Sequence, residues 1–232
     1  MQTRVEIADF ENWRAVAEDA AKVLRAGEVV ALPTETVYGL GADAFNAEAV
    51  AKVFEAKGRP SFDPLIVHIA GIRDLQRVAV VSEELEGVVR QLAKAFWPGP
   101  LTMVLPKHED IPDLVTSGLP TVAVRVSKHE FMRLLSKDLG PIAAPSANRF
   151  GRISPTAASA VLDELKGRIP LVVDGGACSN GLESTIIAVE VGEKRPVLKL
   201  LRPGPVTREE LQKFGKVPRA GRGADDRPEA PG

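Results

Sequence analysis

Cysteine, aromatic residues and net charge are all scarce in this 232-residue chain. The single cysteine, Cys178, excludes a disulfide framework and a metal site built from several cysteines, which favours a reducing compartment. Aromatic residues make up only 5% of the chain, so a stripe of rings for stacking nucleic-acid bases is not expected. Because 30 basic residues face 31 acidic ones, the net charge of −1 argues against a surface that binds nucleic acid throughout, while one local basic cavity stays compatible with it.

Long apolar runs and two common nucleotide-binding signatures are also absent. No apolar stretch approaches the ~18 residues of a membrane span, and residues 1–10 lack the apolar segment of a signal peptide. We therefore expect a cytoplasmic protein with no membrane contact. Neither the G-x-x-x-x-G-K-[ST] loop nor the G-x-G-x-x-G fingerprint occurs, so any nucleotide must be bound by another device.

Helix-like and strand-like segments alternate along the chain. Apolar residues at helical spacing over 13–24 stop at Gly27, which predicts a helix ended by a glycine cap, and Ser82 is placed to cap another helix. Helices are expected at 13–24, 47–56, 83–97, 128–136, 156–165 and 208–214, and strands at 28–32, 65–69, 101–105, 122–126, 171–174, 185–189 and 197–201. Such alternation favours an α/β sheet covered by helices, although it leaves the strand order open.

The composition changes near the C-terminus. Residues 215–232 are rich in Gly, Pro, Arg and Asp and carry one large apolar residue, Val217. We therefore expect one catalytic domain over residues 1–214, followed by a flexible tail or the start of an interdomain linker over 215–232.

Three polar stretches are candidates for chemistry. Pro33–Gly41 follows a strand and offers hydroxyls, a carboxylate and glycines, as a ligand loop or an ordinary turn would. In Lys57–Pro60, a lysine and an arginine lie two residues apart. Either both face one anion, or their positive charges interact favourably with the helix dipole at a helix C-terminus. Pro145–Thr156 directly follows apolar residues 142–144, where a further strand is expected to end. Its amide, hydroxyls and two arginines suit phosphate binding, while Ser154 and Thr156 also suit capping of the next helix.

Four single residues are weaker candidates. His68 alternates with apolar residues and is by default a core histidine. Arg125 lies within an apolar strand and requires an anionic partner. Ser184 and Arg202 are either ligand contacts or ordinary loop and surface residues, and Cys178 is interpreted as structural because spacing suggests no partner histidine.

Taken in order, these stretches resemble the YrdC family over roughly residues 15–212. Each motif alone is weak evidence for the family, but the set of motifs in this order is specific to it. The resemblance rests on Pro33–Gly41, Lys57–Pro60, Pro64–His68, Trp97–Thr102, Val124–Val126, Ala144–Asn148, Glu183–Thr185 and Leu201–Gly204.

The resemblance implies a fold and a reaction. The expected fold is a twisted mixed parallel and antiparallel sheet flanked by helices around a large basic cavity. The expected enzyme is a nucleotidyltransferase that converts L-threonine, bicarbonate or CO2, and ATP into L-threonylcarbamoyladenylate, with release of pyrophosphate. That product serves the formation of N6-threonylcarbamoyladenosine beside the anticodon of tRNA.

The resemblance also implies roles for individual residues. Lys57 and Arg59 are expected to be catalytic, neutralising the triphosphate and the charge on the departing pyrophosphate. The implied ATP-binding residues are Lys57, Arg59, Asp63, Thr121, Ser146, Asn148, Ser154 and Arg202. The implied threonine-binding residues are Thr36, His68, Arg125, Ala144 and Ser184, with Arg125 pairing with the threonine carboxylate. Mg2+ is expected to accompany ATP, with no protein ligand assigned to it.

Expected partners are a downstream threonylcarbamoyl transferase complex and a weak contact with tRNA; the oligomeric state stays open. Longer family members continue into a second domain through a linker that can close over the nucleotide, whereas this sequence stops at Gly232. Two alternatives remain. One is an RNA-binding module without catalysis. The other is an enzyme that carbamoylates partners during hydrogenase maturation; such enzymes carry zinc-binding cysteine pairs, which a chain with one cysteine lacks.

Overall fold

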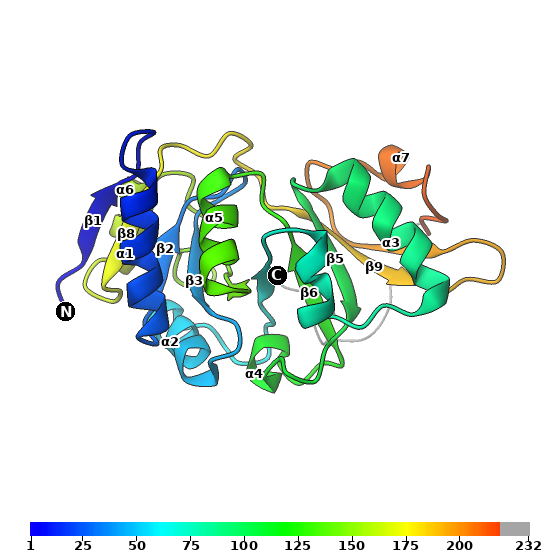
Figure 1. Ribbon diagram of the computed structural model, residues 1–232, viewed down its shortest axis with the longest axis horizontal. Coiled ribbons are helices and arrows are strands. Elements are labelled where there is room, and N and C mark those ends of the chain that lie inside the picture. The colour runs from blue at the N-terminus through cyan, green and yellow to red at the C-terminus, as the bar shows by residue number, and fades with distance from the viewer. Residues whose placement is uncertain (219–232) are drawn as a thin grey trace.

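One mixed sheet organises the chain (Figure 1). A computed structural model describes residues 1–218, and all statements of structure below concern those residues. The strands are β1 (Arg4–Ile7), β2 (Val30–Leu32), β3 (Gly39–Asp43), β4 (Ile66–His68), β5 (Leu101–Pro106), β6 (Thr121–Arg125), β7 (Ile142–Ala143), β8 (Leu171–Asp174), β9 (Thr185–Glu190) and β10 (Val197–Arg202). Their order across the sheet is β1-β8-β2-β3-β7-β4-β6-β5-β9-β10.

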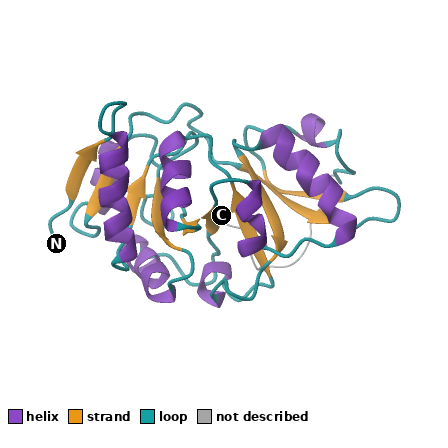
Figure 2. Cartoon of the chain, in the orientation of Figure 1, coloured by secondary structure: helices purple, strands orange, loops and turns teal. Residues whose placement is uncertain are grey.

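Helices flank this sheet (Figure 2). They are α1 (Trp13–Arg25), α2 (Ala47–Lys57), a 3-10 helix η1 (Ile72–Arg77), α3 (Glu83–Phe96), α4 (Asp113–Thr116), α5 (Glu130–Leu139), α6 (Ala158–Leu165) and α7 (Arg208–Leu211). Helices α1 and α5 lie side by side over the part of the sheet that contains β2 and β3, whereas α3 covers the part that contains β5 and β9 (Figure 1). The prediction of an α/β sheet flanked by helices is confirmed.

Parallel and antiparallel pairings are mixed throughout the sheet. Strand β8 runs parallel to both β1 and β2, and β4 and β5 run parallel to β6 and β9 respectively. The remaining neighbours are antiparallel: β2–β3, β3–β7, β4–β7, β5–β6 and β9–β10. The predicted mixed character of the sheet is therefore confirmed.

Both faces of the central strands are buried. Val30 and Leu32 of β2 pack in the cluster under α1 and α5, while Ala31 between them packs in the main cluster on the opposite face. Helix α1 presents a buried stripe at helical spacing, and Gly27, with a φ of 74°, donates its backbone N–H to the carbonyl of Leu24. The predicted helix and its glycine cap are confirmed, since a left-handed residue after the last turn satisfies a free carbonyl.

Two strands were not expected from the sequence. Strand β1 is largely exposed, so it lacks the apolar signal of a buried strand. Strand β3 contains Gly39 and Gly41, and glycine is normally unfavourable in a strand. A Cβ at Gly41 would lie 2.7 Å from Cδ1 of Leu32, so close packing of β3 against its neighbour requires glycine there.

Two expected helix caps are wrong. Ser82 occupies the N-cap position of α3, but its side chain makes no capping hydrogen bond. Helix α6 begins after Ala157, whose side chain cannot cap it, and neither Ser154 nor Thr156 takes that position. The Ser154 hydroxyl instead donates a hydrogen bond to Glu183.

Residues 215–218 pack against β10 and so continue the domain beyond the expected boundary. The backbone N–H of Lys216 donates to Pro196 at 2.8 Å, that of Leu198 donates to Lys216 at 2.8 Å, and Val217 is buried. The rest of the predicted tail, 219–232, lies outside the described residues. Among the residues described, no helix is long and apolar enough to cross a membrane.

Candidate functional site

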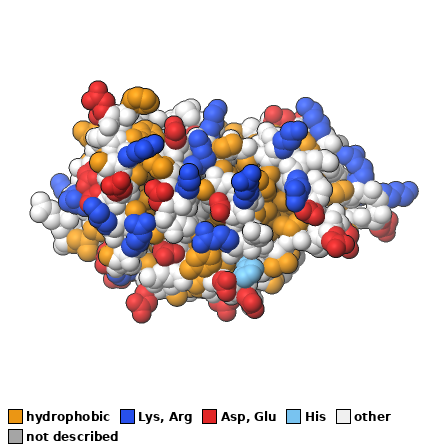
Figure 3. Space-filling model, in the orientation of Figure 1, with side chains coloured by type: hydrophobic (Ala, Val, Ile, Leu, Met, Phe, Trp, Pro, Cys, Tyr) orange, Lys and Arg blue, Asp and Glu red, His pale blue; other side chains and the backbone are white. Residues whose placement is uncertain are grey.

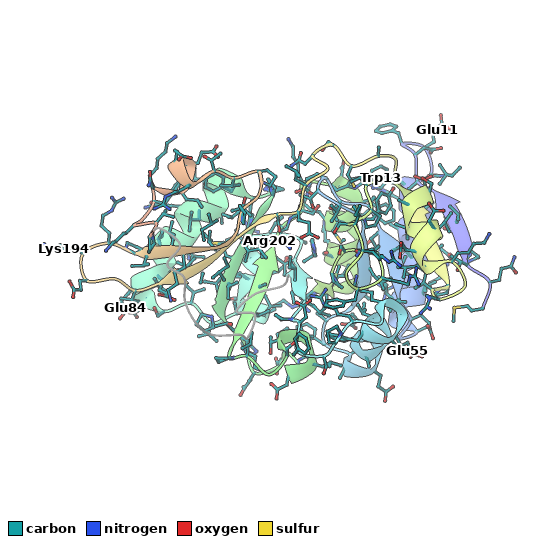
Figure 4. All side chains as sticks on the ribbon, turned by 180° about the vertical axis from the view of Figure 1, so that it is seen from behind. Glu11, Trp13, Glu55, Glu84, Lys194 and Arg202 are labelled. Carbon is teal, nitrogen blue, oxygen red and sulfur yellow. The ribbon has the colours of Figure 1, made fainter. Side chains whose placement is uncertain are left out.

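A small cavity, lined mostly by polar residues, lies where the ends of several strands meet. It is lined by Thr34, Thr36, Val37, Gly39, Arg59, Ile66, His68, Arg125, Ala144, Pro145, Ser146, Glu183, Ser184 and Arg202. All five residues predicted to bind threonine are among them, together with three predicted to bind ATP: Arg59, Ser146 and Arg202. Arg202, the last residue of β10, lies near the middle of the molecule (Figure 4).

The sheet topology brings these distant segments together. His68 of β4 is in register with Arg125 of β6, and β4 also pairs with β7, which leads directly into Ala144. The backbone N–H of Ala144 donates to Ile66 at 2.8 Å, and Gly39 forms a bridge with Ser146. Because β7 lies between β3 and β4, three of the predicted motifs converge on one edge of the cavity.

The Pro33–Gly41 stretch begins with a tight turn built on Thr34. The Thr34 hydroxyl donates to the carbonyl of Val37 at 2.6 Å and accepts from the backbone N–H groups of Thr36 and Val37 at 3.1 and 3.2 Å. A hydroxyl that mimics a backbone turn fixes the local geometry. The turn holds Thr36 in the cavity wall with its hydroxyl against Arg125.

Arg125 is fully buried and bound to a carboxylate that the prediction did not assign to the site. Its Nη2 lies 2.6 Å from Oε1 of Glu35, its Nη1 donates to the Thr36 hydroxyl at 2.8 Å, and its Nε donates to the carbonyl of Gly99 at 3.2 Å. Glu35 also accepts a hydrogen bond from Ser127. A buried guanidinium needs an anionic partner to offset the cost of burying its charge. The sequence offered one indication of this partner, because Glu35 directly precedes the predicted ligand residue Thr36.

The environment of Glu35 keeps it ionised. Burial alone would raise its pKa, but Arg125 and hydrogen bonds from Ser127 and the backbone of Lys128 outweigh burial and lower the pKa to about 2. The site therefore contains a permanent buried ion pair at neutral pH.

The ion pair predicts an acid-sensitive contribution to stability. Because the folded pKa of Glu35 lies below its usual value of 4.5, the stabilisation is complete above about pH 4.5 and is lost as pH falls towards about 2. By pH 3 the free energy of unfolding should fall by about 2 kcal/mol through this group alone. Urea unfolding of the wild type and Glu35→Gln at several pH values below about 5 measures it. Equal pH slopes for the two proteins would contradict the assignment.

Arg59 is held by its own loop. Its Nη2 lies 2.7 Å from Oδ1 of Asp63 and 2.9 Å from the carbonyl of Pro64, and its Nε donates to the backbone of Asp63 at 3.0 Å. The Arg59 and Asp63 side chains are only 4% and 8% exposed. Asp63 therefore lies behind Arg59 rather than in the cavity wall.

Lys57, the last residue of α2, supports the cavity from behind. Its Nζ donates to the carbonyl of Asn148 at 2.5 Å and to that of Ser146, so it anchors the loop that lines the cavity. Burial, and then the charge of Arg59, lower the pKa of Lys57 to about 7. Lys57 is buried at the end of α2 and lies behind the cavity, whereas Arg59 lines it.

Arg202 and two segments of loop meet at Glu183. Arg202 Nη1 donates to Oε2 of Glu183, while the Ser154 hydroxyl donates to Oε1 of Glu183 at 2.6 Å. Arg202 is also bound to Ser184, through Nε to its carbonyl at 3.0 Å and through Nη2 to its hydroxyl at 3.1 Å. The hydroxyl of Thr102 lies 2.7 Å from that of Ser184. Glu183 was not among the predicted site residues, although it directly precedes one of them.

His68 contributes a neutral imidazole to the cavity wall. Burial, followed by the charge of Arg125, lowers its pKa to about 3. Its Nδ1 is buried without a hydrogen-bond partner among the described residues. Because His68 lines the cavity and a buried polar atom without a partner costs free energy, Nδ1 is a candidate for a hydrogen bond with a ligand.

The cavity is nearly neutral, so the expected large basic cavity is not what the structure shows. Arg59, Arg125 and Arg202 contribute three positive charges, and Glu35, Asp63 and Glu183 contribute three negative charges. Lys57, directly behind the cavity, has a pKa of about 7 and is only partly protonated at neutral pH. Each arginine is matched by one carboxylate. Lysine and arginine are likewise interspersed with acidic side chains on the face that carries α1, α3 and α5 (Figure 3).

Three further predicted ATP residues lie outside the cavity wall. Asn148 contacts Lys57 through its carbonyl and donates its side-chain amide to the carbonyls of Arg149 and Arg152 at 2.8 Å. Ser154 reaches the cavity only through Glu183. Thr121 begins β6, at the opposite end of the strand from Arg125, and the structure does not bring it to the cavity.

Close packing at Gly204 predicts a sensitive position behind Glu183. A Cβ there would lie 2.5 Å from the backbone nitrogen of Thr185 and 2.7 Å from the carbonyl oxygen of Glu183. Gly204→Ala should therefore lower the free energy of unfolding by about 1–3 kcal/mol. Gly87→Ala is the control, because a Cβ at that helical position meets nothing within 4 Å and should add up to about 1 kcal/mol. Urea denaturation compares them, and a neutral Gly204→Ala would contradict the packing.

A resident metal site is not supported by the side chains present. Among the residues described, no group of three or more histidine, cysteine, aspartate or glutamate side chains is arranged to hold an ion. The carboxylate that lines the cavity, Glu183, is occupied by Arg202 and Ser154.

The fold and cavity define an α/β protein with a cavity at the ends of its strands, lined by arginines that are each paired with a carboxylate. Residues 22–204 match the Sua5/YciO/YrdC family model, which is described as telomere recombination. The chain belongs to this family.

Two curated relatives show the closeness of the match. The chain is 48% identical over 205 residues to threonylcarbamoyl-AMP synthase of Pyrococcus abyssi, covering 88% of this chain and 58% of that protein. It is 47% identical over 214 residues to threonylcarbamoyl-AMP synthase of Bacillus subtilis, covering 91% of this chain and 60% of that protein. The chain thus spans less than two thirds of the length of these relatives.

A solved structure extends the comparison to a ligand. Sua5 of P. abyssi complexed with L-threonine superimposes with a TM-score of 0.86 at 44% identity, covering all of this chain and 67% of that one.

Proposed function

We propose that this chain synthesises L-threonylcarbamoyladenylate from L-threonine, bicarbonate or CO2, and ATP, with release of pyrophosphate. The observation that carries the proposal is the convergence of five separate segments on one cavity. Thr36, His68, Arg125, Ala144 and Ser184 come from distant parts of the sequence and line the same wall. The P. abyssi relative that is similar over the whole chain is described with L-threonine bound.

The threonine end of the cavity offers charge and hydrogen bonds of the required kind. Arg125 keeps N–H groups beyond the three hydrogen bonds described, and a guanidinium fork suits a carboxylate. The neutral imidazole of His68 and the hydroxyls of Thr36 and Ser184 provide short polar contacts. A neutral histidine adds no charge that would repel the threonine amine.

The same cavity also supplies cations for the polyphosphate. Arg59 and Arg202 line it, and Lys57 lies directly behind Ser146. We assign Lys57 and Arg59 to stabilising the charge that grows on pyrophosphate as it leaves. Ser146, Asn148, Ser154 and Asp63 then orient or support the phosphate-binding groups, and Thr121 remains a predicted contact at a greater distance. We propose that Mg2+ binds together with ATP.

The reaction requires no covalent intermediate with the protein. The threonine nitrogen first forms a bond to the carbon of CO2, giving a carbamate and losing a proton. A carbamate oxygen then attacks the α-phosphorus, and the bond between the α-phosphorus and the bridging oxygen breaks to release pyrophosphate. Positioning and electrostatics carry such a step. Burial raises the pKa of the Cys178 thiol to about 11, so a thiolate nucleophile is disfavoured.

The product defines the expected downstream partner. A carbamoyl adenylate hydrolyses readily, so a cavity that excludes water protects it. We propose that a threonylcarbamoyl transferase complex consumes it to form N6-threonylcarbamoyladenosine beside the tRNA anticodon, with at most a weak contact between this chain and tRNA. The nearly balanced charge of the chain favours this role over that of an RNA-binding module.

Pyrophosphate release tests the proposal. Purified protein is mixed with ATP and Mg2+, and pyrophosphate is followed with threonine and bicarbonate added singly and together. We expect release only when both are present. Release that needs neither addition would indicate simple ATP hydrolysis, and binding of RNA without any release would favour the non-catalytic alternative.

A further inference from the structure

The three carboxylates that pair with the cavity arginines differ in their exposure to the cavity. The side chains of Glu35 and Asp63 are 4% and 8% exposed and lie behind their arginines. Glu183 is 28% exposed and lines the cavity itself. Glu183 is therefore the counterion that an incoming anion can reach and replace with the least rearrangement.

Glu183 occupies two donors at once. Oε1 accepts from the Ser154 hydroxyl and Oε2 from Arg202 Nη1. Both donors are residues assigned above to ATP. A phosphoryl group resembles the Glu183 carboxylate in this respect, because it also carries oxygens on one atom that can accept hydrogen bonds from a hydroxyl and a guanidinium.

Arg202 does not need Glu183 to stay in place. Two other hydrogen bonds fix its guanidinium, one to the Ser184 carbonyl at 3.0 Å and one to the Ser184 hydroxyl at 3.1 Å. Loss of the carboxylate would thus leave Arg202 oriented and its charge uncompensated. If the main role of Glu183 were to hold Arg202 in position, the two contacts with Ser184 would be redundant.

We propose that Glu183 is a displaceable stand-in for a phosphoryl group, which yields Arg202 and Ser154 to the polyphosphate when it binds. The inference rests on the proposed function, because it assumes that the anion is ATP or its product pyrophosphate. Displacement resolves the charge balance of the cavity: a polyanion enters a nearly neutral site by exchanging one anionic partner for another. Each molecule bound therefore costs the separation of Glu183 from Arg202 and Ser154.

Inorganic pyrophosphate is the probe for this exchange, and isothermal titration calorimetry is the measurement. Glu183→Gln keeps the volume and removes the charge, so we expect pyrophosphate to bind about 10-fold more tightly than to the wild type. Glu164→Gln is the matched control. It removes a carboxylate from a second arginine pair, Arg149 to Glu164 at 3.0 Å, which lies outside the cavity lining, and it should change the affinity little.

A double variant separates local exchange from a general change in charge. In an Arg202→Gln background, the gain from Glu183→Gln should disappear, because the released partner is missing. A gain that persists there, or an equal gain in Glu164→Gln, would overturn the proposal, as would weaker binding to Glu183→Gln, which is the result expected if Glu183 mainly holds Arg202 in position. Glu183→Ala replaces the glutamine variant if the latter unfolds.

The two levels of the proposal fail differently. If the wild type binds pyrophosphate and ATP but Glu183→Gln binds no more tightly, the exchange is wrong and the proposed function stands. If none of these proteins binds either anion, both are wrong.

Discussion

Replacement of Arg125 by glutamine is expected to raise the concentration of threonine needed for half-saturation by about 100-fold, since truncation of a buried charged partner typically costs 2–5 kcal/mol. The saturation of ATP should change much less, because Arg125 contacts the wall predicted to hold threonine and makes no contact with Lys57, Arg59 or Arg202 among its hydrogen bonds. Threonine and ATP titrations of pyrophosphate release measure the split. Unchanged threonine saturation would refute the pocket assignment.

Stability has to be separated from binding in that experiment. Arg125→Gln alone leaves Glu35 buried without its counterion, which should cost several kcal/mol of unfolding free energy. The double variant Glu35→Gln with Arg125→Gln removes both buried charges, so most of this stability should return. Threonine binding should not return. A double variant that regains threonine saturation would show that Arg125 acts only through folding.

Lys57→Met should reduce turnover by at least about 100-fold, in line with the loss of a preorganised charge at a reacting centre. Two effects combine: the cation behind the phosphate end disappears, and the carbonyls of Ser146 and Asn148 lose their shared donor. The matched control is Lys52→Met on the same helix, because Lys52 is half-exposed and pairs with Glu28 at the surface. Steady-state kinetics compare them, and a Lys57→Met enzyme with normal turnover would remove Lys57 from the mechanism.

The pKa of Lys57 adds a test by pH. With a pKa of about 7 in the free protein, Lys57 loses its positive charge as pH rises through neutrality, so ATP affinity should decline over that range. Calorimetric titrations of ATP at several pH values should show this decline in the wild type and a smaller one in Lys57→Met. The titration of ATP itself is common to both proteins and cancels.

The elements that the sequence predicted are those with a strong apolar signal. Helix α1 and strands such as β6 bury regular stripes, and their positions were predicted to within a few residues. Strands β1 and β3 were missed because one is exposed and the other depends on glycines that close packing requires. Strand order could not be predicted, since pairing between distant segments leaves no local pattern.

The candidate site divides in the same way. Residues identified through ordered motifs, such as His68 and Arg125, do line one cavity. Their carboxylate partners were not identified, because a motif marks a residue without showing what it contacts. Glu35 and Glu183 each lie next to a predicted ligand residue, and only the folded chain shows that they neutralise Arg125 and Arg202.

These pairings change the expected electrostatics. A cavity predicted to be basic is instead a set of matched ion pairs, with Lys57 as the cation that has no matching carboxylate of its own among the pairs described. Under the proposed function, affinity for ATP depends on which counterions can be exchanged and not on the number of arginines. The exposure of Glu183 makes the Arg202 pair the one to exchange.

The most direct test of the central claim is the identity of the product. Protein, ATP, Mg2+ and threonine are incubated with 13C-labelled bicarbonate, and the mixture is analysed at once by mass spectrometry. We predict an adenylate whose mass includes threonine and one labelled carbon, formed together with pyrophosphate. An adenylate without the label, or AMP and pyrophosphate formed without threonine, would contradict synthesis of a threonylcarbamoyl adenylate by this chain.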